Sequence, residues 1–253
     1  MTRRRLGFWF RLAVVLLRRP LLVLTRRDWR GAEHLPAHGG LVVVTNHISH
    51  FDPLAFALYL YENGRIPRFL GKAAIFEVPF VGTVLRGAGQ IPVLRESTDA
   101  SKAFSAAVDA VRRGECVAIY PEATITRDEG LWPMVGKTGA ARVALATGAP
   151  VVPVAQWGPQ QVLAPYSKRF RFFPLKTMHM LAGPPVDLSA YMGRPVNAEL
   201  LREVTEKIMA AITELLEELR GEQAPAVRFD PRKMGVPTTG DPRRGIRDRR
   251  KSA

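Results

Sequence analysis

Two histidines and an aspartate follow a short apolar stretch early in the chain. Residues 41–45 read LVVVT, and the next eight residues read NHISHFDP. His47 and Asp52 are five positions apart, a separation that turns two side chains about 140° apart on an ideal helix. A turn between them would instead let Asp52 accept a hydrogen bond from one imidazole nitrogen of His47, leaving the other nitrogen as a general base.

The surroundings of this pair limit the chemistry that it could do. No G-x-S-x-G elbow or reactive cysteine accompanies it, so a substrate hydroxyl is the expected nucleophile. The alternative is an Asx-capped turn without a catalytic role. His50 extends the pattern to H-x-x-H-x-D, but the other three histidines lie in no metal-binding spacing, and we expect no metal site.

The stretches around the pair alternate between strand-like and helix-like patterns. The expected strands and helices are, respectively, 41–45, 68–71, 90–95, 116–120, 151–157 and 178–183, and 53–64, 98–113, 139–147 and 199–220. This alternation favours a single-domain α/β fold whose largely parallel or mixed sheet is flanked by helices. Ligand sites in such sheets gather at the carboxyl ends of strands, which is where His47 lies.

The charge of the chain is concentrated at its two ends. The formal net charge is +14; residues 1–30 carry nine arginines against one acid, and residues 225–253 carry nine basic residues against three acids. The body, 31–224, holds 19 basic and 19 acidic residues. A nucleic-acid-binding domain would carry its excess charge on a folded face. We therefore expect an anionic membrane surface as the partner, and no nucleic acid.

The N-terminal segment 6–25 is apolar but interrupted by arginines. Its longest uncharged apolar run is 12–17, whereas a spanning helix needs about 20 apolar residues. The arginines inside it also argue against a secretory signal. We expect an amphipathic helix that anchors the protein at the membrane interface; the alternative is a surface helix packed on the domain.

These observations predict three parts of the chain. They are an anchoring segment at 1–30, a catalytic domain at 31–223 and a basic, disordered tail at 224–253. A single cysteine, Cys116, excludes an internal disulfide and fits a reducing compartment. The expected location is thus the cytoplasmic face of the cell membrane, with peripheral or monotopic attachment. The sequence does not indicate an oligomeric state.

Four ordered blocks resemble those of the glycerolipid acyltransferases, the 1-acyl-glycerol-3-phosphate acyltransferase family. NHISHFD matches the NHxxxxD motif, and GQIPVLR (89–95) is similar to the second block. YPEAT (120–124) is similar to the third block, FPEGT, and VVPV (151–154) to the fourth. The resemblance covers about 38–185 and implies a glycerol-3-phosphate acyltransferase-like fold.

The resemblance also implies a role for individual residues. His47 would deprotonate the acceptor hydroxyl, with Asp52 orienting it, and no covalent acyl-enzyme or cofactor would be required. The acyl donor substrate would be acyl-CoA or acyl carrier protein. Arg95 would hold the phosphate of the acceptor, and Glu122 and Thr124 would help to fix the acceptor.

The third block departs from the family pattern at two positions. Ala123 replaces a glycine, which matters if the position needs a positive φ angle. Ile125 replaces an arginine that would face phosphate. Arg127 and Lys137 are the candidates to substitute for it.

The resulting hypothesis is an O-acyltransferase that esterifies the sn-2 hydroxyl of the lysophospholipid 1-acyl-sn-glycerol-3-phosphate and gives phosphatidic acid. The alternatives are an acyltransferase for another lysophospholipid or glycolipid acceptor, and a non-catalytic lipid-binding protein of the same fold.

Overall fold

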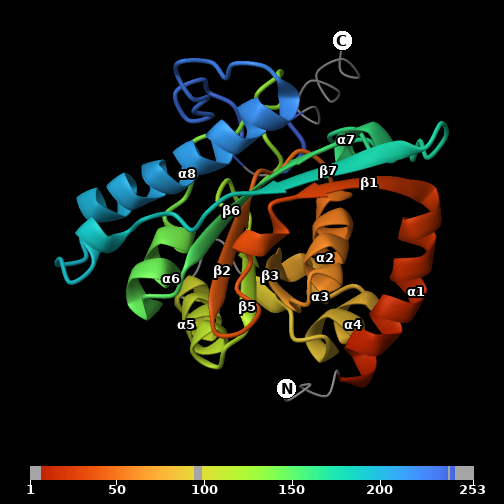
Figure 1. The fold of residues 1–253 in the computed structure, drawn as a ribbon, viewed down its shortest axis with the longest axis horizontal. Helices are drawn as coiled ribbons and strands as arrows, with labels where there is room; N and C mark the ends of the chain where they lie inside the picture. Colours follow the sequence, from red (N-terminus) through yellow and green to blue (C-terminus); the bar gives the residue numbers. More distant parts are fainter. Residues whose placement is uncertain (1–6, 94–98, 239, 243–253) are drawn as a thin grey trace, which may run out of the picture.

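A seven-stranded sheet forms the centre of the computed structural model, which describes residues 7–93, 99–238 and 240–242 (Figure 1). The strand order is β1-β7-β6-β2-β5-β3-β4. Neighbouring strands are parallel except β6 and β7, which are antiparallel. The strands are β1 Thr25–Arg30, β2 Leu41–Thr45, β3 Pro67–Lys72, β4 Ile91–Val93, β5 Cys116–Ile119, β6 Val151–Trp157 and β7 Lys176–Ala182.

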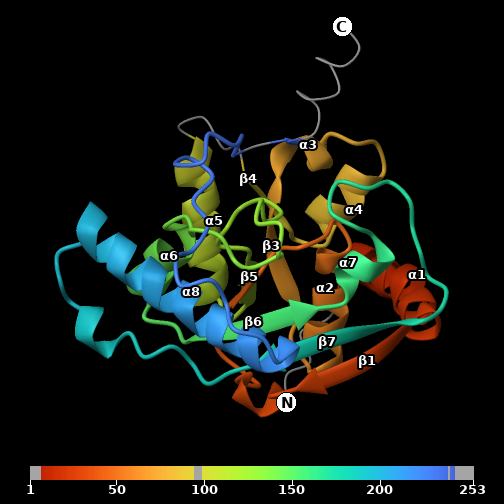
Figure 2. The same cartoon turned by 90° about the horizontal axis from the view of Figure 1, so that it is seen from above.

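Helices cover both faces of this sheet. They are α1 Phe8–Leu24, α2 Asp52–Glu62, α3 Ala73–Phe76, α4 Val81–Gly87, α5 Asp99–Arg112, α6 Gly139–Thr147, α7 Pro159–Val162 and α8 Ala198–Arg220, with 3₁₀ turns at Ala32–His34 and Ser189–Tyr191. Seen from above, α5, α6 and α8 lie on one side of the sheet, and α1, α2 and α4 lie on the other (Figure 2). The predicted α/β fold with a mixed sheet is thus confirmed.

The central strands are apolar on both faces because helices cover both. In β2, Val42 and Val44 pack into the core layer under α5, α6 and α8. Val43 faces the opposite layer with Phe56 and Tyr59 of α2. A strand buried on both faces shows a continuous β-branched run rather than alternation, as in LVVVT. Because β2 is packed on both faces, its carboxyl end is held in place, and the polar residues Asn46 and His47 follow it directly.

Helix α1 packs along the domain but leaves much apolar surface exposed. Arg18 pairs with Glu62 of α2 at 2.6 Å between Nε and Oε1, and Leu21 is buried. Val15 is 70% exposed and Val23 is 72% exposed. Within the described part of the chain, no helix is both long enough and apolar enough to span a bilayer.

Two chain ends differ from the expected three-part division. Residues Thr25–Arg30 were expected within the anchoring segment, but they form β1, the edge strand beside β7. The tail 224–253 is expected to be disordered, but its described part, 224–238 and 240–242, contacts the domain: the Val135 amide donates to the Phe229 carbonyl at 3.0 Å, and Arg127 donates to the Pro237 and Gly240 carbonyls. The sheet and its covering segments therefore extend beyond 31–223 at both ends.

Candidate active site

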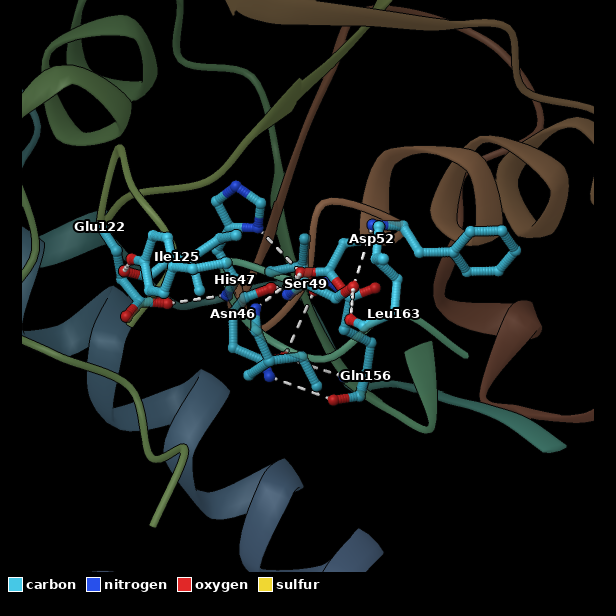
Figure 3. A network of polar contacts seen from close by, with 12 residues as sticks. Asn46, His47, Ser49, Asp52, Glu122, Ile125, Gln156 and Leu163 are labelled. Atoms are coloured by element: carbon cyan, nitrogen blue, oxygen red, sulfur yellow. Dashed lines mark hydrogen bonds and ion pairs between the residues drawn. The ribbon is translucent and has the colours of Figure 1, made fainter. Parts of the chain in front are cut away.

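The turn after β2 brings His47 and Asp52 together (Figure 3). Nδ1 of His47 lies 2.8 Å from Oδ2 of Asp52. Asp52 is the first residue of α2, so the intervening residues form a turn and not a helix. Among the described residues, Nε2 of His47 has no hydrogen-bond partner. The geometry therefore leaves Nε2 as the nitrogen that could accept a proton from a substrate.

The Asp52 carboxylate also organises the turn itself. Its Oδ2 atom accepts hydrogen bonds from the amides of Ile48, at 2.6 Å, and Ser49, at 2.8 Å. The side chain is fully buried at the N-terminus of α2, where the helix dipole favours a negative charge. Burial raises the pKa of Asp52, and the His47 contact and the two amides oppose this rise. One carboxylate thus fixes both the imidazole and the backbone that carries it.

Ser49 attaches the same turn to the chain after α7. Its hydroxyl donates to the carbonyl of Leu163 at 2.6 Å, and it accepts from the Phe51 amide at 3.0 Å. His50 is exposed and lies edge-on to the Tyr166 ring, with centroids 6.1 Å apart. Partial desolvation of its ring lowers the pKa of His50, nearby His47 lowers it further, and the carboxylates of Asp52 and Asp241 oppose this shift. The turn is therefore supported on the side of residues 163–166.

Glu122 comes to the site from the loop after β5, but both of its oxygens bond to the backbone. Oε1 accepts from the His47 amide at 2.8 Å, and Oε2 accepts from the Met134 amide at 3.0 Å. Burial raises the pKa of this carboxyl to about 8. The resemblance implies that Glu122 helps to fix the acceptor; in the structure its two oxygens join the backbone at His47 to the backbone at Met134.

The two departures in the third block have structural counterparts. Ala123 has φ of 59°, in the left-handed region that glycine occupies without strain. The Ile125 side chain is 1% exposed and belongs to the core. Position 125 therefore contributes apolar packing and no charge in this chain.

Arg127 directs its guanidinium toward the C-terminal segment. Its Nε donates to the Pro237 carbonyl at 3.1 Å, and its Nη2 donates to the Gly240 carbonyl at 2.7 Å. Its Nη1 bonds to the Tyr166 hydroxyl, and the guanidinium also lies over that ring at 4.8 Å. Each guanidinium nitrogen of Arg127, one of the two candidates to replace the missing arginine, thus bonds to another part of the protein.

Thr124, Lys137 and Arg95 are the remaining residues that were predicted to bind the substrate. Thr124 is half-buried in the loop after β5. Lys137 is exposed, and its amide donates to the Pro121 carbonyl at 2.8 Å, which holds it next to the third block. Arg95 falls in 94–98, outside the described residues. The roles of all three in substrate binding stay predictions.

Tyr120 is a site residue that sequence reasoning missed. Its ring stacks on the His47 imidazole, with centroids 4.3 Å apart and planes 28° apart. The tyrosine is the first letter of the YPEAT block, but the residue type alone gave no sign of this contact.

An amide pair forms a second unpredicted support. Asn46 and Gln156 exchange hydrogen bonds: the Asn46 side chain donates to the Gln156 carbonyl at 3.0 Å and accepts from the Gln156 amide at 2.9 Å. The Gln156 side chain donates to the Asn46 carbonyl at 2.6 Å. Both residues are fully buried. They fasten the end of β2 to β6, directly before His47.

The arrangement is suited to general-base chemistry. Three groups converge on the His47 residue: Asp52 on Nδ1, Glu122 on its amide and Tyr120 on its ring face. Over the described parts of the chain, no three His, Cys, Asp or Glu side chains are grouped so as to hold a metal ion.

Comparisons with known proteins identify a family, similar sequences and a similar structure. Residues 26–157 match the model of the family described as Acyltransferase. A 1-acyl-sn-glycerol-3-phosphate acyltransferase of Borreliella burgdorferi is 34% identical over 125 residues, which are 49% of this chain and 48% of that protein. The chloroplastic 1-acyl-sn-glycerol-3-phosphate acyltransferase BAT2 of Brassica napus is 30% identical, over 54% of this chain and 39% of that protein. The matched region thus spans about half or less of these two relatives.

A solved structure shares the fold. The crystal structure of PlsC, the 1-acyl-sn-glycerophosphate acyltransferase of Thermotoga maritima, superposes with a TM-score of 0.59 at 22% identity. The superposition covers 85% of this chain and 78% of that chain. The family model covers more than half of the present sequence and includes the turn that holds His47 and Asp52. The chain therefore belongs to the acyltransferase family.

Proposed function

We propose that this protein transfers a fatty acyl group to the free sn-2 hydroxyl of 1-acyl-sn-glycerol-3-phosphate and so forms phosphatidic acid. The donor is acyl-CoA or acyl carrier protein, and no cofactor is needed. The observation that carries the proposal is the 2.8 Å contact between His47 Nδ1 and Asp52 Oδ2, which leaves Nε2 available. The names of the relatives support the choice of acceptor.

The proposed reaction uses His47 as base and then as acid. Nε2 takes the proton of the acceptor hydroxyl as its oxygen attacks the thioester carbonyl. The tetrahedral intermediate collapses, the C–S bond breaks, and the departing sulfur receives the proton from Nε2. The products are an ester and a free thiol, and no covalent acyl-enzyme forms.

Asp52 supports the imidazolium that exists between these two proton transfers. Its Oδ2 atom fixes the ring so that Nδ1 keeps its proton, and its negative charge stabilises the positive ring. Positioned general bases contribute about 10²- to 10⁴-fold to a rate.

The lipid acceptor places the reaction at a membrane. Helix α1 exposes apolar side chains between its arginines, in the manner of an interfacial helix. We propose peripheral or monotopic attachment to the cytoplasmic face of the cell membrane through this helix.

A different lysophospholipid or glycolipid acceptor is the second candidate function. The buried Ile125 supplies no charge, and the guanidinium of Arg127 bonds to the C-terminal segment and Tyr166. Both observations reduce the number of cations in the third block that could hold a phosphomonoester.

An acceptor panel tests the proposal. Purified protein is incubated with labelled acyl-CoA or labelled acyl-acyl carrier protein, and with 1-acyl-sn-glycerol-3-phosphate, lysophosphatidylcholine, lysophosphatidylglycerol or a lyso-glycolipid. We expect phosphatidic acid as the preferred product. Preference for another acceptor would favour the second candidate. No transfer to any acceptor from either donor would contradict both and leave the non-catalytic lipid-binding protein.

A further inference from the structure

The loop between α7 and β7 exposes aromatic and basic side chains together. Residues 168–176 read KRFRFFPLK, and the chain contains no acidic residue between 130 and 186. Phe170 is 53% exposed and Phe173 is 77% exposed. Lys168, Arg169 and Arg171 are exposed beside them. Large exposed aromatics among like charges are unusual on a surface that contacts only water.

The inner side of this loop is fixed to the catalytic turn. The Arg171 amide donates to the Val162 carbonyl at 2.8 Å. Phe172 packs edge-on against Phe51, with centroids 6.1 Å apart, and stacks on Phe170 at 5.6 Å. Phe51 directly precedes Asp52. The exposed side chains of the loop therefore have a defined position relative to the His47 site.

The C-terminal end of the loop joins the sheet beside the end of α1. Lys176, at the start of β7, pairs in register with Thr25, which follows α1 directly. In Figures 1 and 2 the loop lies on the same side of the molecule as α1 and α4.

Most of the large apolar side chains that are exposed in the described residues lie on these segments. Of the sixteen large apolar side chains that are exposed in the described chain, eleven belong to α1, to residues 75–81 or to this loop. They are Phe8, Val15, Leu16, Leu17, Val23, Ile75, Val78, Phe80, Val81, Phe170 and Phe173.

We propose that residues 168–176 form a second membrane-contact element, separate from α1, that binds the surface of an anionic bilayer. Phe170 and Phe173 enter the interfacial region, and Lys168, Arg169 and Arg171 meet lipid phosphates. The positive charge selects an anionic bilayer over an apolar protein partner. The proposal rests on the proposed function in one respect: a lipid acceptor requires the site to face a membrane. The contacts of the loop with the catalytic turn would set the orientation of the site toward that membrane.

Vesicle sedimentation of the full chain tests this element. Binding is measured on vesicles of phosphatidylcholine alone and of phosphatidylcholine mixed with phosphatidylglycerol. One variant is Phe170→Ser with Phe173→Ser, and the other is Arg169→Gln with Arg171→Gln. Matched controls change exposed residues elsewhere: Val196→Ser with Val227→Ser, and Arg202→Gln with Lys233→Gln. Circular dichroism and thermal melting confirm that each variant is folded.

Each basic residue near an anionic surface contributes about fivefold to binding, so the arginine variant should bind anionic vesicles roughly tenfold or more weakly. The phenylalanine variant should also bind them more weakly, while both controls match the wild type. Turnover of a short-chain acceptor dispersed in detergent should be unchanged in both loop variants.

Wild-type binding by both loop variants, or an equal loss in the controls, would overturn the proposal. If only the phenylalanine variant weakened, the role assigned to the charges would be wrong. Vesicle binding is measured without turnover, so a wild-type protein that transfers no acyl group would refute the proposed function and leave this test intact.

Discussion

The imidazole of His47 lies against the ring of Tyr120, with the planes 28° apart and the centroids separated by 4.3 Å. The two residues follow different strands, β2 and β5, which are parallel neighbours in the sheet. Asp52 restrains the histidine through Nδ1, and Tyr120 restrains the plane of its ring. The free Nε2 atom is therefore held in one direction by two independent contacts.

Replacing Tyr120 tests the second contact. Aromatic pairs contribute about 0.5–1.5 kcal/mol beyond their buried area, so Tyr120→Leu should lower kcat/KM roughly twofold to tenfold. Tyr120→Phe keeps a ring and should retain nearly full activity. Steady-state kinetics on both variants, with melting temperatures as a control for folding, check this. An equal loss in both variants would assign the effect to the hydroxyl group and not to stacking.

Asp52→Asn tests the orientation of the imidazole. Asparagine keeps the size of the side chain, but it loses the charge that supports a protonated ring and its amide can favour the wrong tautomer. We expect kcat to fall by about 10²- to 10⁴-fold with little change in KM.

The matched control for this variant is Asp187→Asn, an exposed aspartate that accepts from the Ser189 amide at 3.0 Å. Urea unfolding of both variants separates catalysis from stability. Unchanged turnover in folded Asp52→Asn protein would show that the carboxylate has only the structural role of binding the two amides.

Glu122 should make stability depend on pH. Burial raises its pKa in the folded protein to about 8, from an ordinary value of 4.5. The folded state therefore holds the proton more tightly than the unfolded state. The contribution of this proton to stability is fully present below pH 4.5 and is lost as the pH rises toward about 8.

Comparison with Glu122→Gln isolates this effect. The amide cannot ionise, so the free energy of unfolding of wild type relative to the variant should fall as the pH rises from about 5 to 8 and then level off. Urea unfolding at a series of pH values measures it. A constant difference across this range would contradict the raised pKa.

Ala123→Gly should stabilise the protein. The left-handed conformation costs an L-residue about 1–2 kcal/mol, and replacement by glycine removes this strain. Glycine has more conformational freedom in the unfolded chain, which lowers the free energy of unfolding by about 0.4–1 kcal/mol and offsets part of the gain. The expected increase in the free energy of unfolding is therefore about 1 kcal/mol or slightly less. Chemical denaturation measures it, and a decrease would show that the methyl group contributes packing that outweighs the strain.

The main elements of the fold could be predicted because local patterns determine them. LVVVT forms β2 over the predicted residues 41–45, and the helix predicted at 139–147 forms α6. β1 was missed because its sequence, TRRDWR, has no strand pattern; it forms through pairing with β7 at an exposed edge. Pairing between distant segments leaves no periodic signal in either one.

The site shows the same division. The juxtaposition of His47 and Asp52 was predicted because a short turn constrains residues five positions apart. The stacking of Tyr120 on His47 and the bonds of Glu122 to two amides depend on which strands are neighbours. The family resemblance implies a substrate-binding role for Glu122; only the fold reveals that both of its oxygens accept from backbone amides.

The most direct test of the account replaces the proposed base. Wild-type protein and His47→Gln are compared in acyl transfer from labelled acyl-CoA to 1-acyl-sn-glycerol-3-phosphate, with vesicle binding and urea unfolding measured in parallel. The account predicts that transfer falls by at least about 10²-fold while membrane binding and stability stay close to wild type. Turnover at the wild-type rate in the folded variant would contradict it.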